Sequence, residues 1–225
     1  MINASALAIT QALSDPLRLA VLQHLMGGPA TVTELMLVTT AAQSRLSNHL
    51  AVLRERRLVR AIRQGRQVVY EIHDPAVGRL VESLAQITGP PPRTVKSAPV
   101  ARARTCYDHL AGRLGVAVFQ ALVAADALRT PKTGRDGVEL GPRADKVFTS
   151  LGVDVDAART MRRQLLSACL DWTERQPHLG GALGAALWAE LTARRWIARR
   201  PGTRAVIVTR AGTRGLKRTL GVALE

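Results

Sequence analysis

Apolar residues recur at helical spacing through the first 90 residues and predict five short helices. The segments run from Ser5 to Leu13, from Asp15 to Leu25, from Thr31 to Val38, from Ala41 onward, and from Asp74 to Ile87. Asp15 followed by Pro16 is a typical N-cap and first-turn pair. Thr31 and Glu34 have the spacing of a capping box. These local signals predict where the helices begin.

The fourth predicted helix is apolar on one side and polar on the others. Leu46, Leu50 and Leu53 follow one another at i, i+4 and i+7, so one stripe can be buried while polar residues face outward. Two runs rich in β-branched residues follow, 58–63 and 67–72, with Gly65 between them, which predicts a hairpin. One helix of this kind fits the major groove of DNA, and a basic hairpin can hold nearby phosphates. The order of elements indicates a winged helix-turn-helix.

The stretch SRLSNHLAVLRERRLVRAIRQGRQVVYEI resembles the ArsR/SmtB family of bacterial winged-helix repressors, and ALSDPLRLAVLQHL upstream resembles the second helix of that family. The resemblance covers residues 5–87. It implies a homodimer that the first helix helps to build, a palindromic operator in double-stranded DNA, and repression relieved by an inducer. We expect the DNA contacts to come from polar and basic side chains of the fourth helix and the hairpin. Gln43, Ser44, Ser47 and Asn48 are expected at base edges, and Arg45 at bases or phosphate. Arg54 is a further DNA-contacting candidate, His49 is packed or at phosphate, and Arg63 and Arg66 are expected at the DNA backbone.

The resemblance suggests two kinds of metal site, and this sequence lacks the ligands of both. Met36 and Val38 stand in the third helix where an arsenic-type site would need thiolates. The fifth helix offers only Glu82, with His73 and Asp74 just before it, which cannot close a tetrahedral zinc site. We therefore expect any sensing function to lie after Gly89.

The chain after residue 88 predicts a Pro-rich linker and a second domain. We place a winged helix-turn-helix domain at 1–88, the linker at 89–102 and an effector domain at 103–225. The fold class is mainly α with small β-wings (α+β), and the second domain is mostly helical. Its predicted elements are helices at 106–128, at 154–172 and at 178–195, strands at 196–198 and 204–209, and a final helix at 211–220. The last strands and helix suggest a second winged-helix-like unit, and LGPRADKVFTSLGV at 140–153 resembles TRAGTRGLKRTLGV at 209–222.

Composition narrows the class of protein. A chain of 225 residues with 47% hydrophobic residues favours two domains with real cores. No stretch approaches 18 uninterrupted apolar residues and no secretory signal is apparent, so we expect no membrane partner. With only Cys106 and Cys169, a disulfide scaffold is excluded and a reducing cytoplasm is expected. The sequence lacks a Gly-rich phosphate loop and a nucleophile elbow, so we expect no enzyme.

The net charge of +15 and the isoelectric point near 11.5 favour a polyanionic partner. Residues 1–90 hold nine basic and six acidic residues, whereas residues 91–225 hold 23 and 11, so most of the excess lies outside the predicted DNA-binding domain. It can be a solvated arginine-rich surface or a second DNA-contacting surface. Another class of protein also fits this charge: a nucleoid-type protein that coats DNA without sequence preference.

The candidate effector residues lie in CYDHLAG and CLDWTERQPHLGG: Cys106, His109, Cys169, Asp171 and His178. Two thiolates and two imidazoles suit a soft or borderline ion such as Cd(II), Pb(II) or Zn(II). These segments also resemble a longer, metal-responsive branch of ArsR-like regulators. Three other interpretations stay open: the cysteines pack as small apolar residues, Cys106 at a helix N-terminus senses oxidants or electrophiles, or the three tryptophans line a small-molecule pocket.

Overall fold

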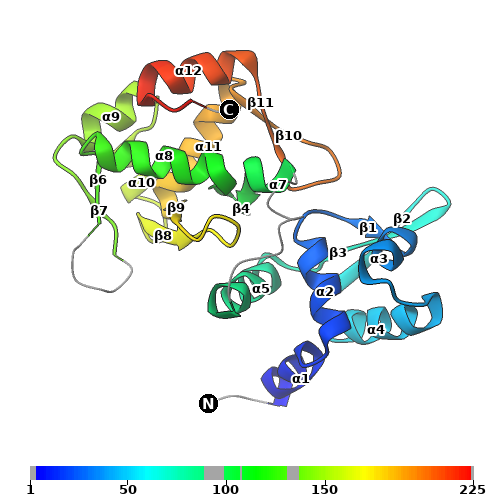
Figure 1. The fold of residues 1–225 in the computed structure, drawn as a ribbon. Helices are drawn as coiled ribbons and strands as arrows, with labels where there is room; N and C mark the ends of the chain where they lie inside the picture. Colours follow the sequence, from blue (N-terminus) through cyan, green and yellow to red (C-terminus); the bar gives the residue numbers. More distant parts are fainter. Residues whose placement is uncertain (1–3, 89–98, 107, 131–136, 224–225) are drawn as a thin grey trace. The chain divides into compact units, whose positions relative to one another are not determined.

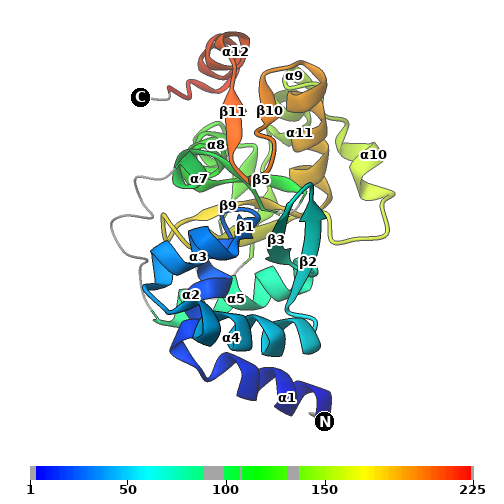
Figure 2. The same cartoon turned by 90° about the vertical axis from the view of Figure 1, so that its right-hand side faces the viewer.

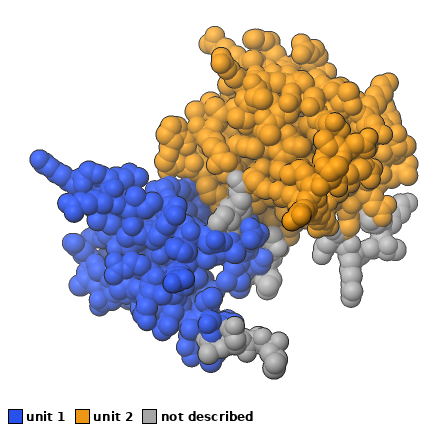
Figure 3. Space-filling view, turned by 180° about the vertical axis from the view of Figure 1, so that it is seen from behind, with its two compact units in different colours: residues 1–87 blue, residues 88–225 orange. Residues whose placement is uncertain are grey.

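The computed structural model describes residues 4–88, 99–106, 108–130 and 137–223, drawn in Figure 1. The chain divides into two compact units, Met1–Ile87 and Thr88–Glu225, which Figure 3 colours separately. The predicted linker segment 89–98 lies outside the described residues, and residues 99–102, which we included in the linker, form a short helix. Within the described part of the chain, each helix is too short or too polar to cross a bilayer.

Unit 1 is a winged helix-turn-helix. Its elements in chain order are α1 (Ala4–Leu13), α2 (Pro16–Leu25), β1 (Ala30–Thr31), α3 (Val32–Thr39), α4 (Gln43–Glu55), β2 (Val59–Gln64), β3 (Gln67–Ile72) and α5 (Pro75–Thr88). The strands form an antiparallel sheet in the order β1-β3-β2, and β2 and β3 are the wing. Leu46, Leu50 and Leu53 of α4 are buried in the core, which leaves the polar faces of this helix exposed. The predicted architecture of this unit is confirmed.

The predicted starts of α2 and α3 are also confirmed, whereas α4, expected from Ala41, begins at Gln43. The carboxylate of Asp15 accepts a hydrogen bond from the backbone N–H of Arg18, and Pro16 is the first residue of α2. Thr31 and Glu34 form a complete capping box, in which each side chain accepts from the other residue's backbone N–H. Both caps satisfy backbone donors that the first turn of a helix leaves unpaired.

Unit 2 is built from short hairpins and helices. Its elements are α7 (Pro99–Arg102), β4 (Arg104–Cys106), β5 (His109–Ala111), α8 (Gly112–Ala124), β6 (Leu128–Arg129), β7 (Glu139–Leu140), α9 (Ala144–Ser150), α10 (Val155–Arg159), β8 (Ser167–Leu170), β9 (Pro177–Gly180), α11 (Gly181–Ala193), β10 (Ile197–Arg199), β11 (Val206–Val208) and α12 (Arg210–Leu220). The strands pair antiparallel as β4-β5, β6-β7, β8-β9 and β10-β11. A single apolar core that includes Phe119, Phe148 and Trp188 joins the helices.

Unit 2 contains the same arrangement twice. Hairpin β4-β5, helix α8, hairpin β6-β7 and helix α9 are followed by hairpin β8-β9, helix α11, hairpin β10-β11 and helix α12. The copies are offset by 69 residues, and backbone angles match across that offset: φ is 74° at Gly112 and 78° at Gly181, and 81° at Gly152 and 69° at Gly221. The segments 140–153 and 209–222, which resemble each other in sequence, occupy equivalent places.

The first helix of each copy packs against the first hairpin of the other copy. Helix α8 packs against β9 and helix α11 packs against β5. Gly115 and Gly184 let each helix approach the strand that precedes it, because a Cβ at Gly115 would lie 2.5 Å from the Leu110 carbonyl oxygen and one at Gly184 would lie 2.5 Å from the Leu179 carbonyl oxygen. Such a distance is shorter than any real Cβ contact, so both positions require glycine. Across the copies, the same two Cβ atoms would lie 3.5 Å from His178 Cβ and 3.2 Å from His109 Cβ. The arrangement has the character of a pseudo-two-fold interface.

Three predicted helices of the second domain are wrong in part. Cys106 and His109 were expected on one face of a helix, but they lie on β4 and β5, and the helix begins at Gly112. Cys169 was expected on a helix and lies on β8, while His178 lies on β9 before α11. Leucines at helical spacing begin in these short strands and continue into the helices, at Leu110 and Leu114 and at Leu179 and Leu183, so helical spacing extends past the true helix starts. Because Cys106 is not at a helix N-terminus, the macrodipole gives no support to the thiol-sensor interpretation.

Candidate functional site

The recognition helix α4 presents a continuous polar surface. Gln43, Ser44, Arg45, Ser47, Asn48 and Arg54 are all exposed, and the buried leucines hold the opposite side of the helix in the core. Ala42, the N-cap residue, makes no side-chain capping bond, so the first backbone N–H groups of α4 keep the polarity that favours a phosphate. Sequence reasoning identified this surface because a period of 3.6 separates its faces.

Two further features of unit 1 bear on this polar surface: the arginines of the wing and the contacts of His49. Arg63 and Arg66 are exposed at the tip of the β2-β3 hairpin, whereas the neighbouring Arg60 pairs with Glu71 across the hairpin. His49 is half-buried, and its Nδ1 lies 3.4 Å from Asp15 Oδ1 and 3.4 Å from Arg18 Nη1. His49 thus contacts the start of α2, which helps to fix α4 on the unit.

Three of the five candidate ligands come together in unit 2. Cys106, His109 and His178 are buried, and their potential ligand atoms all lie within 4.8 Å of one another. Strand pairing explains the meeting: Cys106 pairs with His109 across β4-β5, Cys169 pairs with His178 across β8-β9, and β5 contacts β9. The two imidazole rings stack with their centroids 5.2 Å apart. The cluster therefore lies where the two copies of the repeat meet.

The imidazoles of the cluster differ in their surroundings. His109 Nδ1 lies 2.9 Å from Asp108 Oδ1, a carboxylate that also pairs with Arg163. Such a carboxylate orients a ligand imidazole in many metal sites. Burial, reinforced by the His109 ring, lowers the pKa of His178 to about 3. His178 is thus neutral at neutral pH, and neither of its ring nitrogens has a hydrogen-bond partner among the described residues.

Asp171 has another role at this site. Its carboxylate is fully buried and accepts hydrogen bonds from Arg104 Nη2 at 2.9 Å, from the Gly112 N–H at 2.7 Å, and from Thr173 and Glu174. Burial alone would raise the pKa of Asp171, but the Arg104 guanidinium and these hydrogen bonds lower it to about 2. Its Oδ2 lies 3.6 Å from His178 Nδ1, so the charged carboxylate borders the cluster while its oxygens are held by other groups.

Cys169 lies near the cluster but outside the group of three. Its Sγ lies 3.7 Å from Ser167 Oγ, and its side chain is only partly buried. A Cβ placed at Gly180 would lie 2.9 Å from Cys169 Sγ and 3.4 Å from His109 Cε1, so this sulfur lies near the cluster. Cys106 and Cys169 are thus associated with opposite hairpins of the two copies.

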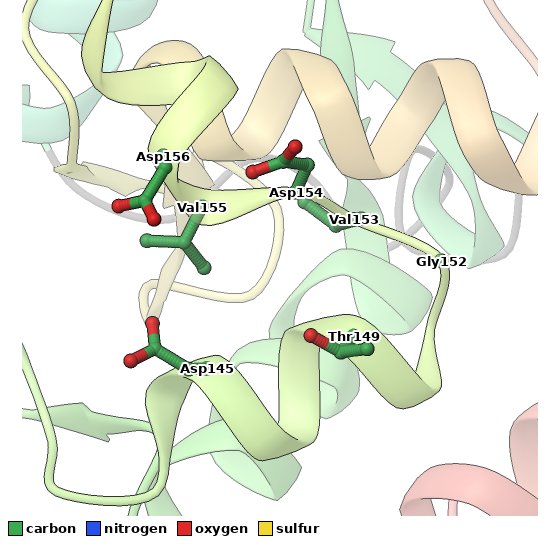
Figure 4. Close-up of a pocket in the computed structure, with 7 residues that line it drawn as sticks. All are labelled: Asp145, Thr149, Gly152, Val153, Asp154, Val155 and Asp156. Carbon is green, nitrogen blue, oxygen red and sulfur yellow. The ribbon is translucent and has the colours of Figure 1, made fainter.

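A second group of acidic residues lines a surface hollow between α9 and α10 (Figure 4). Asp154 caps α10 by accepting a hydrogen bond from the Ala157 N–H, and the exposed Asp156 lies 3.6 Å from Arg159. Acidic residues in these positions are ordinary stabilisers of a helix N-terminus. The hollow therefore has a structural explanation.

One sequence signal could have placed the cluster and was missed. HLAGRLGVA at 109–117 and HLGGALGAA at 178–186 agree at six of nine positions, at the same offset of 69 residues as the structural repeat. His109 and His178 each begin one copy. Recognition of this pair would have placed the two histidines at equivalent positions. Asp108, which contacts His109, has no such signal, because the equivalent residue of the second copy is Pro177.

Comparison with known proteins agrees with the winged helix-turn-helix structure of unit 1. The family model described as "Bacterial regulatory protein, arsR family" matches residues 15–61, which include α2, α3 and α4. An uncharacterized HTH-type transcriptional regulator of Bacillus subtilis, YdfF, is 34% identical over 232 aligned residues that cover 99% of this chain and 100% of that protein. The chain belongs to the ArsR family. It is a DNA-binding transcriptional regulator and not an enzyme.

Other proteins match a smaller part of the chain. A probable mercury resistance operon repressor of Streptomyces lividans is 38% identical over 71 residues, which cover 32% of this chain and 57% of that protein. Among solved structures, reduced HlyU from Vibrio cholerae is 30% identical and covers 38% of this chain and 90% of its own, with a TM-score of 0.36. The similarity to YdfF, in contrast, extends over both units of this chain.

Proposed function

We propose that this ArsR-family regulator is a homodimeric repressor that leaves its operator when a soft or borderline metal ion binds in unit 2. The observation that carries the proposal is the buried meeting of Cys106, His109 and His178, whose ligand atoms lie within 4.8 Å of one another. A tetrahedral ion holds nitrogen and sulfur ligands roughly 3.4–3.8 Å apart, so small side-chain movements would suffice.

The donor set fits the proposed ion class. One thiolate and two imidazoles suit Zn(II), Cd(II) or Pb(II), whereas oxygen-seeking ions such as Mg(II) are poorly served by these donors. Neutral His178 offers a lone pair, and Asp108 orients His109. When bound, the ion would supply positive charge and a bridge between β4-β5 and β9. Part of this chain is similar to the probable mercury resistance operon repressor of Streptomyces lividans, which supports a metal ion as the inducer.

The DNA-binding part of the proposal assigns roles on unit 1. Gln43, Ser44, Ser47 and Asn48 lie on the exposed side of α4 and are proposed to contact base edges. The exposed arginines of α4 and the wing, Arg45, Arg54, Arg63 and Arg66, are proposed to hold phosphates, with Arg45 also near bases. His49 acts by positioning α4 through its contact with α2.

Two copies of the chain are proposed to bind a palindrome, because two recognition helices one DNA turn apart read it better than one. Leu7 of α1 is 56% exposed and Leu80 of α5 is 38% exposed, so both helices offer apolar side chains to a partner. Sedimentation of the free protein at micromolar concentration measures this directly. A monomer that stays a monomer on operator DNA would contradict the dimer.

The test of the metal site is a titration of the reduced, full-length protein with Cd(II), followed by thiolate-to-metal charge-transfer absorption. We expect one ion per chain in the wild type and loss of this absorption in Cys106→Ser. Cys169→Ser is the matched thiol control and should retain the ion. X-ray absorption of the Zn(II)-loaded wild type should show sulfur and nitrogen ligands together.

The same variants test the regulation. An operator selected from random duplex DNA should be released by Cd(II) from the wild type and from Cys169→Ser, with an affinity loss of about 5- to 150-fold, the usual range of allosteric coupling. Cys106→Ser should keep its DNA affinity when the ion is added. If Cys106→Ser binds Cd(II) and releases DNA like the wild type, the proposed site is wrong. If the ion binds at this site but DNA affinity does not change, the site stands and its role as the sensor is refuted.

A further inference from the structure

The two copies of the unit 2 repeat differ sharply in charge. Residues 191–222 of the second copy hold nine arginines and lysines and no acidic residue. The equivalent residues 122–153 of the first copy hold five basic and four acidic residues. Since both copies have the same order of helix, hairpin and helix, the fold itself does not require this positive charge. The excess of positive charge is therefore specific to the second copy and is not part of what the two copies share.

Helix α12 carries much of this charge on one face. Arg210, Arg214, Lys217 and Arg218 follow one another at i, i+4, i+7 and i+8, and all four are exposed. None of them forms an ion pair with a residue that the structure describes. The opposite face is fixed in the unit: a Cβ at Gly215 would lie 2.3 Å from the Trp196 ring, and Leu216 is buried. The basic face of α12 therefore cannot turn inward.

The preceding segment adds charge next to this helix. Arg195, Arg199 and Arg200 are exposed around the β10-β11 hairpin. Thr209, the N-cap of α12, bonds the carbonyl oxygen of Arg195 at 2.8 Å, which ties the start of the helix to this turn. Within unit 2, α12 lies on the outer side beside the hairpin in both ribbon views (Figure 1, Figure 2). Helix and hairpin thus lie side by side and each exposes basic side chains, which together are called the basic surface below.

We propose that this basic surface of α12 and the β10-β11 hairpin binds the phosphate backbone of DNA, as a contact additional to that of unit 1. Fixed, unpaired arginines on a rigid helix are suited to a regularly spaced polyanion, since each neutralised phosphate releases a condensed counterion. DNA is the polyanion that this chain already binds through unit 1, and covalent attachment keeps unit 2 near that DNA at high effective concentration. The surface lacks large apolar side chains on the exposed face of α12 that an interfacial membrane helix would insert.

The test compares two charge-matched variants of the full chain. In the first, Arg210, Arg214, Lys217 and Arg218 are all changed to Gln; in the second, the exposed Arg129, Arg143, Lys146 and Arg159, which lie outside this surface, are changed to Gln. Affinity for a random-sequence DNA duplex is measured against salt concentration in the presence of EDTA, so that the metal site does not enter. Thermal unfolding shows that both variants remain folded.

The α12 variant should bind more weakly than the wild type, and its plot of log affinity against log salt should be less steep by about 2 to 4, since each lost phosphate contact changes the slope by about 0.9. The control variant should retain the wild-type slope. Equal slope changes in both variants would show a general effect of net charge and overturn the proposal, as would no change in either. Vesicles of phosphatidylglycerol and phosphatidylcholine are assayed in parallel. If the α12 variant loses vesicle binding while its DNA slope is unchanged, the surface binds membranes instead.

Discussion

The buried pair of Arg104 and Asp171 should be the most sensitive point of unit 2, and Asp171→Asn is the substitution that tests it. Both residues have a relative exposure of 0%. Asn has the same shape as Asp, so no cavity forms and the change is one of charge and hydrogen bonding alone. Because Arg104 and the hydrogen bonds hold the pKa of Asp171 at about 2, the substitution removes a real negative charge at neutral pH.

The size of the effect follows from the contacts of the two oxygens. If the amide oxygen takes the place of Oδ1, it can still accept from Thr173 and Glu174. The amide nitrogen then takes the place of Oδ2 and faces two donors, Arg104 Nη2 and the Gly112 N–H. Removing one partner of a buried ion pair costs about 3–5 kcal/mol, because the other charge stays buried without compensation. For a unit of this size, about 4 kcal/mol lowers the melting temperature by about 14 °C.

Tryptophan fluorescence reports this change selectively. Trp172, Trp188 and Trp196 all lie in unit 2, so fluorescence during urea or thermal unfolding follows that unit and not the DNA-binding unit. The matched control is Glu190→Gln, which breaks the partly exposed pair of Glu190 and Arg194 on α11. An exposed pair on a helix contributes about 0.5 kcal/mol, so the control should shift the transition by at most a few degrees.

The outcome separates the two kinds of ion pair. A loss in Asp171→Asn of several kcal/mol, against almost none in Glu190→Gln, supports the assignment of Asp171 as the group that compensates Arg104. Equal shifts in the two variants would refute the reasoning, since they would show that burial gives this pair no special weight.

Two further predictions concern DNA reading and the close approach of α11 to the strand that precedes it. Ser47→Ala should weaken operator binding more than random-DNA binding, whereas Arg66→Ala should weaken both alike, as competition binding assays would show; equal losses in both variants would remove this division of roles. Gly184→Ala should destabilise unit 2 by about 1–3 kcal/mol in the same fluorescence assay, because the new Cβ would lie 2.5 Å from the Leu179 carbonyl oxygen. Gly65→Ala lies in the wing of unit 1, whereas all three tryptophans lie in unit 2, so it should leave that fluorescence transition unchanged.

Sequence reasoning succeeded where neighbouring residues carry the signal. The starts of α2 and α3 depend on a cap and a residue three positions later, so Asp15 and Thr31 identify them without knowledge of the rest of the chain. The wing could be predicted for the same reason, because Gly65 supplies a positive φ of 62° at a turn between two β-branched runs.

The same reasoning failed where the structure depends on distant pairing. Strands β4 and β5 are three residues each, too short to show an alternating pattern, and they pair with each other. The break before α8 is made by Gly112 with a φ of 74°, which apolar spacing does not register. Asp171 was interpreted as a ligand because nothing near it in sequence shows that Arg104, 67 residues away, occupies its oxygen.

The pseudo-two-fold meeting of His109 and His178 has a consequence for how the protein responds to concentration. The two stacked rings come from equivalent positions of two copies, as they would in a symmetric dimer of a half-sized chain. In such a dimer the cluster would disappear on dilution. Here both halves are on one polypeptide, so the cluster assembles in a first-order folding step and is equally complete at every protein concentration. A regulator present in few copies per cell thus keeps an intact cluster in each of its molecules.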